Sequence, residues 1–187
     1  MRKAALRIFL FSSLLTCVFE PITRADSAPI TLCVKPEASL PVSDVDLFQI
    51  GGGAVLSARF PLGDFPLQIG PDVGFMIQSL QKVSEFLTVV GIGGGAQLNL
   101  KITSWLQASP YVESGYYYSL AVGSGGGSLY VGAGLNVGLL LGPSFEIGLV
   151  RGYRFNIGLY QAAVIGLESR LLIGGGKAAS TSSGEAQ

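Results

Sequence analysis

The stretch GSGGGSLYVGAGLNVGLLLGPSFEIGLV, residues Gly123–Val150, decides the fold class of this chain. It is apolar and almost free of charge, so a hydropathy window alone favours a membrane helix. Apolar side chains nevertheless occupy every second position from Leu129 to Leu141, and most positions between them are small or polar. Neighbouring side chains of a β-strand point to opposite faces, whereas a helix repeats about every 3.6 residues. The alternation therefore predicts a β-hairpin that turns at Gly142-Pro143.

The same two-residue period extends over most of the chain. In each run, one set of alternate positions is apolar and the other is polar or small. The chain also repeats itself, because Ile50-Gly-Gly-Gly-Ala54 recurs as Ile92-Gly-Gly-Gly-Ala96. This repeat fits a fold of stacked antiparallel hairpins of about 40 residues each. The alternating runs are 48–60, 67–78, 86–101, 106–118, 128–141 and 145–154.

The length of these runs separates a membrane barrel from a soluble β-sandwich, in which one face is also apolar. Runs of roughly 12 to 16 residues exceed the usual globular strand of about 5 to 6 and suffice for a tilted strand that crosses a bilayer. The apolar positions carry one charge, Arg151, near the end of its run. Aromatic side chains gather near the run ends, where interfacial girdles lie. Because lipid tolerates no open sheet edge, we predict an all-β, antiparallel, up-and-down transmembrane β-barrel of about eight strands built from repeated hairpins.

The two ends of the chain predict export and an unstructured tail. A basic start, a short apolar segment and the cleavage site Thr23-Arg24-Ala25 indicate a signal peptide over residues 1–25. Leu14-Leu15-Thr16-Cys17 is a poor lipoprotein box, so we do not expect lipidation of Cys17. Residues 155–173 must supply one or two strands, and Ile30–Val34 is a weaker candidate for the remaining one. The remaining segments are an N-terminal extension at 26–44, the β-barrel at 45–173 and a disordered C-terminal tail at 174–187.

Composition excludes several classes of function. Acidic and basic residues balance at 12 each, so nucleic acid is not indicated as a partner. The chain has no histidine, which removes the commonest general base and metal ligand. We therefore expect no catalytic residue, no metal and no cofactor. Residues 91–96 match the GxGxxA pattern of nucleotide-binding folds, but that motif requires a helix where strand alternation continues through Leu98.

The inward-facing charges are the candidate site of the predicted barrel. Their basic and acidic members can pair, and the pairs would then plug and stiffen the lumen. The alternative is a polar gate or a small-solute binding site, for which the many inward glycines could leave room. Pro71 and Pro110 lie inside strands and lack the N–H that a ladder needs, which indicates possible strand bulges. The lumen-facing charged residues are Arg59, Asp72, Lys101, Glu113, Glu146 and Arg154.

The export signal, the alternating runs and the aromatic girdles together resemble those of the small outer-membrane β-barrels of diderm bacteria, the outer-membrane protein A, X and W types. The resemblance covers about residues 45–173. The resemblance does not select one of these types. It implies a location in the cell outer membrane, outer-membrane lipid as the partner and a monomeric state. Similarity to the W type implies a narrow, porin-like transport barrel for a small solute, apolar solutes included. Two alternatives stay open: a structural or surface-interaction barrel with a plugged lumen, and a soluble periplasmic ligand-binding β-barrel.

Overall fold

The computed structural model describes residues 29–63, 65–81, 85–121 and 124–174, which form strands joined by short turns. No helix that is long and apolar enough to cross a membrane occurs among them. The predicted signal peptide at 1–25, Cys17 within it, and the predicted tail beyond Gly174 lie outside the described residues. The strands are β1 Ile30–Pro41, β2 Phe48–Pro61, β3 Leu67–Leu80, β4 Phe86–Leu98, β5 Leu100–Lys101, β6 Leu106–Ala121, β7 Ser124–Leu140, β8 Phe145–Asn156 and β9 Tyr160–Ile173.

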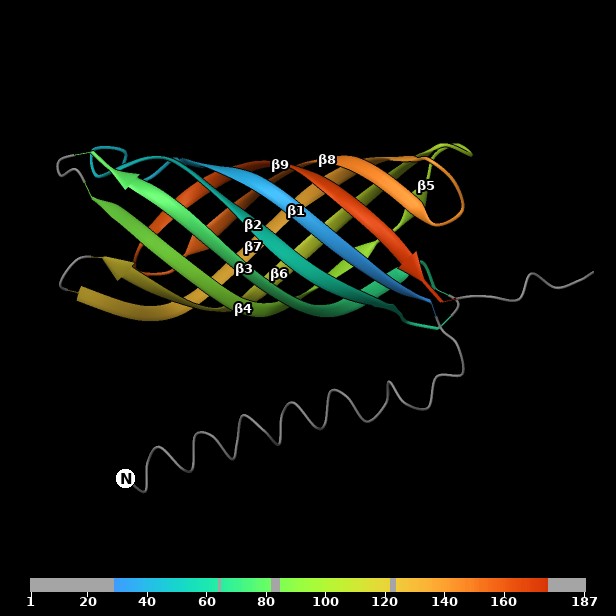
Figure 1. The fold of residues 1–187 in the computed structure, drawn as a ribbon, viewed down its shortest axis with the longest axis horizontal. Helices are drawn as coiled ribbons and strands as arrows, with labels where there is room; N and C mark the ends of the chain where they lie inside the picture. The colour runs from blue at the N-terminus through green and yellow to red at the C-terminus, as the bar shows by residue number, and fades with distance from the viewer. Residues whose placement is uncertain (1–28, 64, 82–84, 122–123, 175–187) are drawn as a thin grey trace, which may run out of the picture. The chain divides into compact units, whose positions relative to one another are not determined.

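The strands close into a barrel, as Figure 1 shows. Neighbours along the chain pair antiparallel, and β1 also pairs with β9, which joins the two ends of the sheet order. Asn99 alone separates β4 from β5, and both pair with β6 in one register, with Gln97 opposite Tyr111 and Leu100 opposite Ala108. The two segments therefore act as one strand. The eight-stranded, up-and-down antiparallel barrel predicted from the sequence is confirmed.

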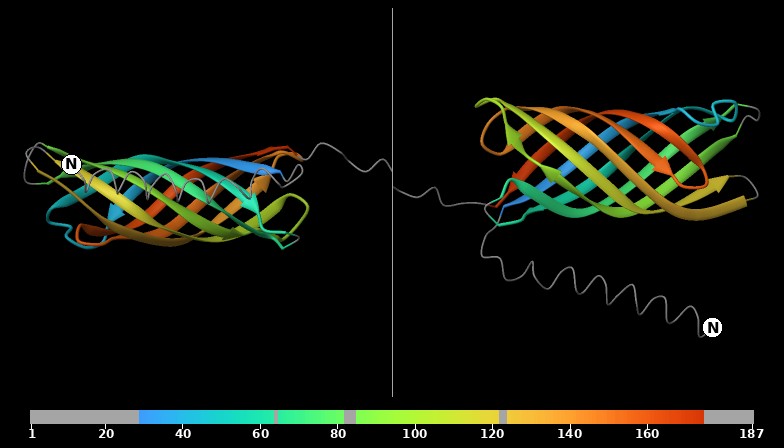
Figure 2. Two further views of the ribbon diagram at one scale, coloured as in Figure 1. Left: turned by 90° about the horizontal axis from the view of Figure 1, so that it is seen from below. Right: turned by 180° about the vertical axis from the view of Figure 1, so that it is seen from behind.

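The barrel has two ends, which we name by the position of its first and last strands. At the terminal end, β1 begins at Ile30 opposite Ile173, the last residue of β9. The strands β2, β5 and β7 finish at this end, whereas β1, β3, β6 and β8 finish at the opposite, distal end. Figure 2 shows the barrel from two further sides, with short connections between the tilted strands.

The N-terminal boundary of the barrel differs from the prediction. The sequence predicts an extension at residues 26–44, but residues 30–41 form β1, which pairs with β2 on one side and β9 on the other. The prediction is wrong because Pro36 and Pro41 make an alternating strand look irregular. Ile30–Val34, the weaker strand candidate, is the first part of β1. Residues 155–173 supply one complete strand, β9, and the last residues of β8.

Side chains follow the predicted alternation, with one exception at the distal end. Outward positions are apolar and exposed; Leu56, Val112 and Leu149 each expose 57% of their surface. We call this outward surface of β1–β9 the outer belt. The β2–β3 register shifts between Phe48 and Gly51, and such an irregularity exchanges the two faces of a strand. Phe48 therefore packs inside against the buried Tyr160 instead of joining the outer belt, with ring centroids 4.9 Å apart.

Neither Pro71 nor Pro110 marks a bulge. Pro71 lies opposite Gly94 and Pro110 lies opposite Leu135, and the register is the same on both sides of each pair. On its other edge each proline faces a short gap in the ladder, because it has no N–H to donate. A gap adds no residue to either strand, so the predicted bulges are wrong.

Candidate functional site

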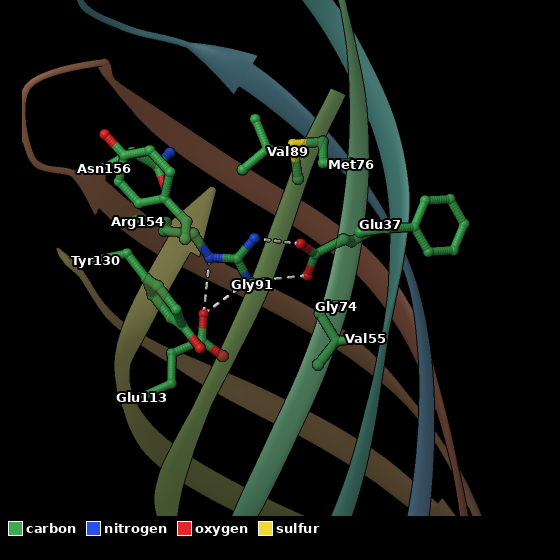
Figure 3. A pocket seen from close by; sticks show the side chains of 12 residues that line it. Glu37, Val55, Gly74, Met76, Val89, Gly91, Glu113, Tyr130, Arg154 and Asn156 are labelled. Atoms are coloured by element: carbon green, nitrogen blue, oxygen red, sulfur yellow. Dashed lines mark hydrogen bonds and ion pairs between the residues drawn. The ribbon is translucent and has the colours of Figure 1, made fainter. Parts of the chain in front are cut away.

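Four charged side chains meet in the lumen and form what we call the central ring: Lys35 and Glu37 of β1, Glu113 of β6 and Arg154 of β8. Figure 3 shows three of them, Glu37, Glu113 and Arg154. Lys35 Nζ lies 3.3 Å from Glu113 Oε2 and 3.6 Å from Glu37 Oε2. Arg154 Nη2 lies 2.7 Å from Glu113 Oε1, and Arg154 Nη1 pairs with Glu37. Positive and negative charges therefore alternate around a closed ring that has no net charge.

The central ring is withdrawn from solvent. The side chains of Glu37 and Glu113 expose 1% and 5% of their surface, and that of Arg154 exposes 12%. Removing a charge from water costs several kcal/mol unless opposite charges and hydrogen bonds compensate. Each member of the ring has two opposite charges beside it, so the arrangement meets this condition as a unit.

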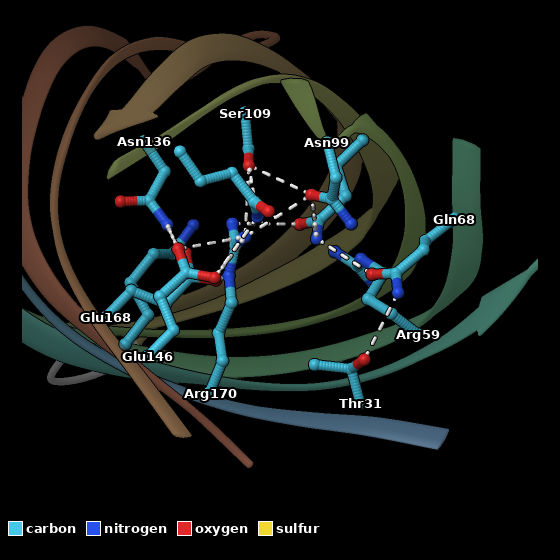
Figure 4. A network of polar contacts seen from close by, with 12 residues as sticks. Thr31, Arg59, Gln68, Asn99, Ser109, Asn136, Glu146, Glu168 and Arg170 are labelled. Carbon is cyan, nitrogen blue, oxygen red and sulfur yellow. Dashed lines mark hydrogen bonds and ion pairs between the residues drawn. The ribbon is translucent and has the colours of Figure 1, made fainter. Parts of the chain in front are cut away.

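A second polar group, the terminal cluster, fills the lumen nearer the terminal end around Arg170 of β9 (Figure 4). The Arg170 guanidinium pairs with Glu168 and, at 3.3 Å, with Glu146. It also donates hydrogen bonds to Ser109 Oγ at 3.1 Å and to Gln97 Oε1 at 3.2 Å. The other amides of the cluster are Asn99, Gln107 and Asn136. Side chains from five strands thus converge on one guanidinium and its carboxylates.

A separate ion pair bridges β2 and β3. Arg59 Nη2 lies 2.6 Å from Asp72 Oδ1. Arg59 Nη1 also donates to the carbonyl oxygens of Gly70 and Pro71, at 3.1 and 3.3 Å. These carbonyls lie beside the ladder gap at Pro71. The arginine therefore supplies hydrogen-bond donors where the strand ladder lacks them.

The distal part of the lumen holds a buried apolar cluster, beside which the polar side chains of Ser39, Gln78 and Asn156 are also buried. Phe48 and Leu80 pack against the cluster. Tyr117 Oη donates to the carbonyl of Ile157 at 2.6 Å, which satisfies a hydroxyl that would otherwise be buried without a partner. The buried members of this distal cluster are Met76, Leu87, Val89, Tyr117, Tyr130, Tyr160 and Ala162.

Two hollows lie beside these groups, a small cavity and a wider recess. A cavity of about 40 Å³ lies beside the central ring and the distal cluster, which is room for only one or a few water molecules. A wider recess of about 470 Å³ opens at the terminal end and reaches inward to Arg170 and Glu146. The cavity and the recess share no lining residue.

The inward glycines do not widen the lumen, because neighbouring side chains lie over them. A Cβ atom on Gly93 would stand 2.6 Å from Tyr130 Oη, and one on Gly134 would stand 2.6 Å from Tyr111 Oη. Both separations are shorter than van der Waals contact. Tyrosine side chains thus take up the space at these two glycines, and glutamate side chains do so at Gly132 and Gly138.

Most of the sequence-predicted charges lie together in the lumen. Arg59, Asp72, Glu113 and Glu146 are buried there, and Arg154 joins the central ring. Lys101 is instead exposed at the terminal end, where it lines the recess.

The alternating runs did not predict four lumen charges, and five of the seven ion pairs among the described residues involve one of these four residues. Glu146 pairs with Arg170, which the candidate set did not contain. All four lie on β1 or β9, the strands that the alternating runs did not resolve. A signal was present on β1, where Lys35 and Glu37 alternate with apolar neighbours, but on β9 the polar Ser169 interrupts the alternation between Glu168 and Arg170. The missed residues are Lys35, Glu37, Glu168 and Arg170.

No protein-family model and no curated protein matches the chain. Solved structures do. Neisserial surface protein A is 13% identical with a TM-score of 0.56, over 76% of this chain and 95% of that one. Ail, the attachment invasion locus protein of Yersinia pestis, is 12% identical in its crystal structure with a TM-score of 0.50, and the match covers 79% of this chain and 99% of that one. The backbone structure of the Yersinia pestis outer membrane protein Ail in a phospholipid bilayer nanodisc is 12% identical with a TM-score of 0.51, and the match covers 77% of this chain and 99% of that one. At these identities the similarity concerns the fold, which is that of the small outer-membrane β-barrels.

Proposed function

We propose that this chain is an integral outer-membrane β-barrel with a plugged lumen, which acts through its outer belt and its two ends and does not conduct solutes. The proposal assigns it no enzymatic activity and no cofactor. The observation that carries it is the central ring, in which charges from β1, β6 and β8 meet across the lumen. The terminal cluster and the distal cluster fill the lumen on either side.

The outer belt supports placement in a membrane. Large apolar side chains such as Ile50 and Phe86 expose 66% and 63% of their surface, and they belong to a belt that surrounds the barrel. Soluble monomers rarely expose contiguous apolar patches larger than a few hundred Å². Ail, which has a similar fold, has been described in a phospholipid bilayer. These observations weigh against the soluble periplasmic ligand-binding alternative.

Ion conductance in planar bilayers and solute flux from liposomes test the plugged lumen. The refolded chain should first show a closed barrel, seen as a mobility difference between heated and unheated samples in SDS gels. We expect no flux above empty liposomes, because the cavity beside the central ring holds only about 40 Å³. Steady wild-type flux of ions or small apolar solutes would contradict the proposal.

A matched pair of variants tests whether the central ring is what blocks the lumen. Removing the whole ring in K35A/E37A/E113A/R154A leaves the net charge unchanged and should raise ion flux above background. Lys101→Ala, which removes an exposed cation at the mouth of the recess, should leave flux at background. Equal flux from both variants would mean that another part of the lumen, and not the central ring, blocks the passage of ions.

A narrow transport barrel is the second candidate, and the terminal recess is the observation that favours it. Its volume of about 470 Å³ falls within the range of small-molecule sites. Its lining is mixed, with the polar side chains of Gln68, Asn99 and Gln107 beside apolar ones such as Leu140 and Phe145. Uptake of a polar solute that Gln107→Ala abolishes would favour this candidate over the plugged barrel.

A further inference from the structure

Arg151 is the one charged residue on the outward faces of the strands that the structure describes. It is exposed and lies in the middle of β8, opposite Leu135 of β7 and Ile165 of β9. The alternating run 145–154 predicts that it lies near a strand end, which is wrong because β8 continues to Asn156. An arginine that faces hydrocarbon costs about 2–4 kcal/mol at the bilayer midplane and less toward the interface. A partner for its charge would offset this cost.

Aromatic side chains follow Arg151 directly on the distal side. Tyr153 and Phe155 occupy the next two outward positions of β8, with ring centroids 4.9 Å apart. Tyr153 Oη donates to Gln161 Oε1 at 3.1 Å. Aromatic side chains with polar ends mark the headgroup level of a bilayer. Arg151 lies one outward position deeper, and a long arginine side chain can extend over that distance.

The surface beside Tyr153 leaves room for a headgroup. Its cross-strand neighbours are Ala133 of β7 and Ala163 of β9, and both side chains are small. A phosphate can therefore approach the Arg151 guanidinium from the distal side, while acyl chains lie along the apolar outer belt.

Charge complementarity selects the partner. A second copy of this chain would bring no carboxylate to Arg151 from its described outward strand faces, and a twofold contact there would oppose two arginines. A bilayer itself supplies phosphate, which guanidinium binds through paired hydrogen bonds. The acidic residues of the described strands face the lumen and are paired there; they are Glu37, Asp72, Glu113, Glu146 and Glu168.

We propose that Arg151, together with the amide nitrogen of Gln161 whose side chain Tyr153 holds in place, binds the phosphate of an anionic membrane lipid in the leaflet at the distal end. This inference rests on the membrane placement in the proposed function. The acidic turn residues Asp44 and Asp46 lie beyond Gln161, whose carbonyl accepts from the backbone of Val42 at 2.9 Å. They are therefore further along the barrel than the guanidinium.

Lipid retention tests the site. The chain is refolded into phosphatidylcholine vesicles that contain phosphatidylglycerol or lipid A, extracted with mild detergent and analysed by native mass spectrometry. We expect wild type to retain about fivefold more anionic lipid than R151Q, since one surface arginine contributes about 1 kcal/mol toward an anionic membrane. The control K101Q removes an exposed cation at the terminal end and should retain as much as wild type.

The outcomes separate the site from the fold and from other ligands. Equal retention by wild type and R151Q overturns the proposal. Displacement of the lipid by inorganic phosphate alone also overturns it, because the ligand would then be a free anion. All comparisons use protein whose unheated gel band shows a closed barrel. A wild-type chain that lacks the band shift and does not enter vesicles contradicts the proposed function itself.

Discussion

At the scale of single residues, the lumen depends on balanced charge and on small side chains in fixed places. Each charge of the central ring lies beside two opposite charges. Glycines leave room for neighbouring side chains to pack directly on the backbone, as Tyr130 does at Gly93. In a closed interior of this kind, an unbalanced charge or an added methyl group has few ways to relax.

Glu113→Ala should be among the most destabilising single changes in the lumen. It leaves Lys35 and Arg154 with only Glu37 between them, and removing one partner of a buried ion pair typically costs about 3–5 kcal/mol. The double variant K35A/E113A restores the charge balance and should be less destabilised than E113A. Urea unfolding in lipid, followed by the fluorescence of Trp105, measures both.

Asp46→Ala is the matched control, because it removes one negative charge from an exposed turn. It should change the free energy of unfolding by no more than about 0.5 kcal/mol. If E113A proves as stable as D46A, the central ring does not hold the lumen together.

Gly93→Ala should destabilise the barrel by about 1–3 kcal/mol, the usual cost of overpacking. The added Cβ would stand 2.2 Å from the carbonyl oxygen of Ser114, which is backbone and cannot swing away. Gly126→Ala, where nothing lies within 4 Å of the new atom, should be tolerated. The same urea titration compares them, and similar midpoints would contradict tight packing around Tyr130.

At the scale of strands, the period of two predicts most of the barrel. It correctly predicts β2 through β8, because each has an apolar outward set and a small or polar inward set. It missed most of β1, where Pro36 was read as irregular structure. Pro36 is tolerated in β1 because it pairs with Ala54 on the β2 side and lies at a gap in the ladder with β9.

Deleting residues 29–41 should prevent formation of a closed barrel. The loss of β1 leaves β2 and β9 with unpaired edges, and lipid offers no partner for their backbone groups. We expect the deleted chain to lose the heat-dependent gel shift. Deleting residues 175–187, which follow the last strand, serves as the control and should preserve the shift. A shift that survives the loss of β1 would mean that seven strands can close.

At the scale of the whole molecule, the sequence predicts which charges face inward but not how they pair. Inward position follows from the parity of a strand, and Arg59, Asp72, Glu113 and Glu146 are buried accordingly. Pairing depends on closure, which joins residues far apart in the chain. Lys35 and Glu113, for example, are separated by 78 positions. No local pattern specifies such a contact.

The make-up of the central ring has a consequence for how the barrel is assembled. β1 shares no ladder with β6 or β8, so its two charges reach the ring only when the first strand docks on the last. Until then the parts are separately neutral: Lys35 has Glu37 on its own strand, and Arg154 has Glu113. Neither part of the incomplete sheet then carries a net ring charge into hydrocarbon. Closure of the barrel therefore joins two neutral pairs into one ring.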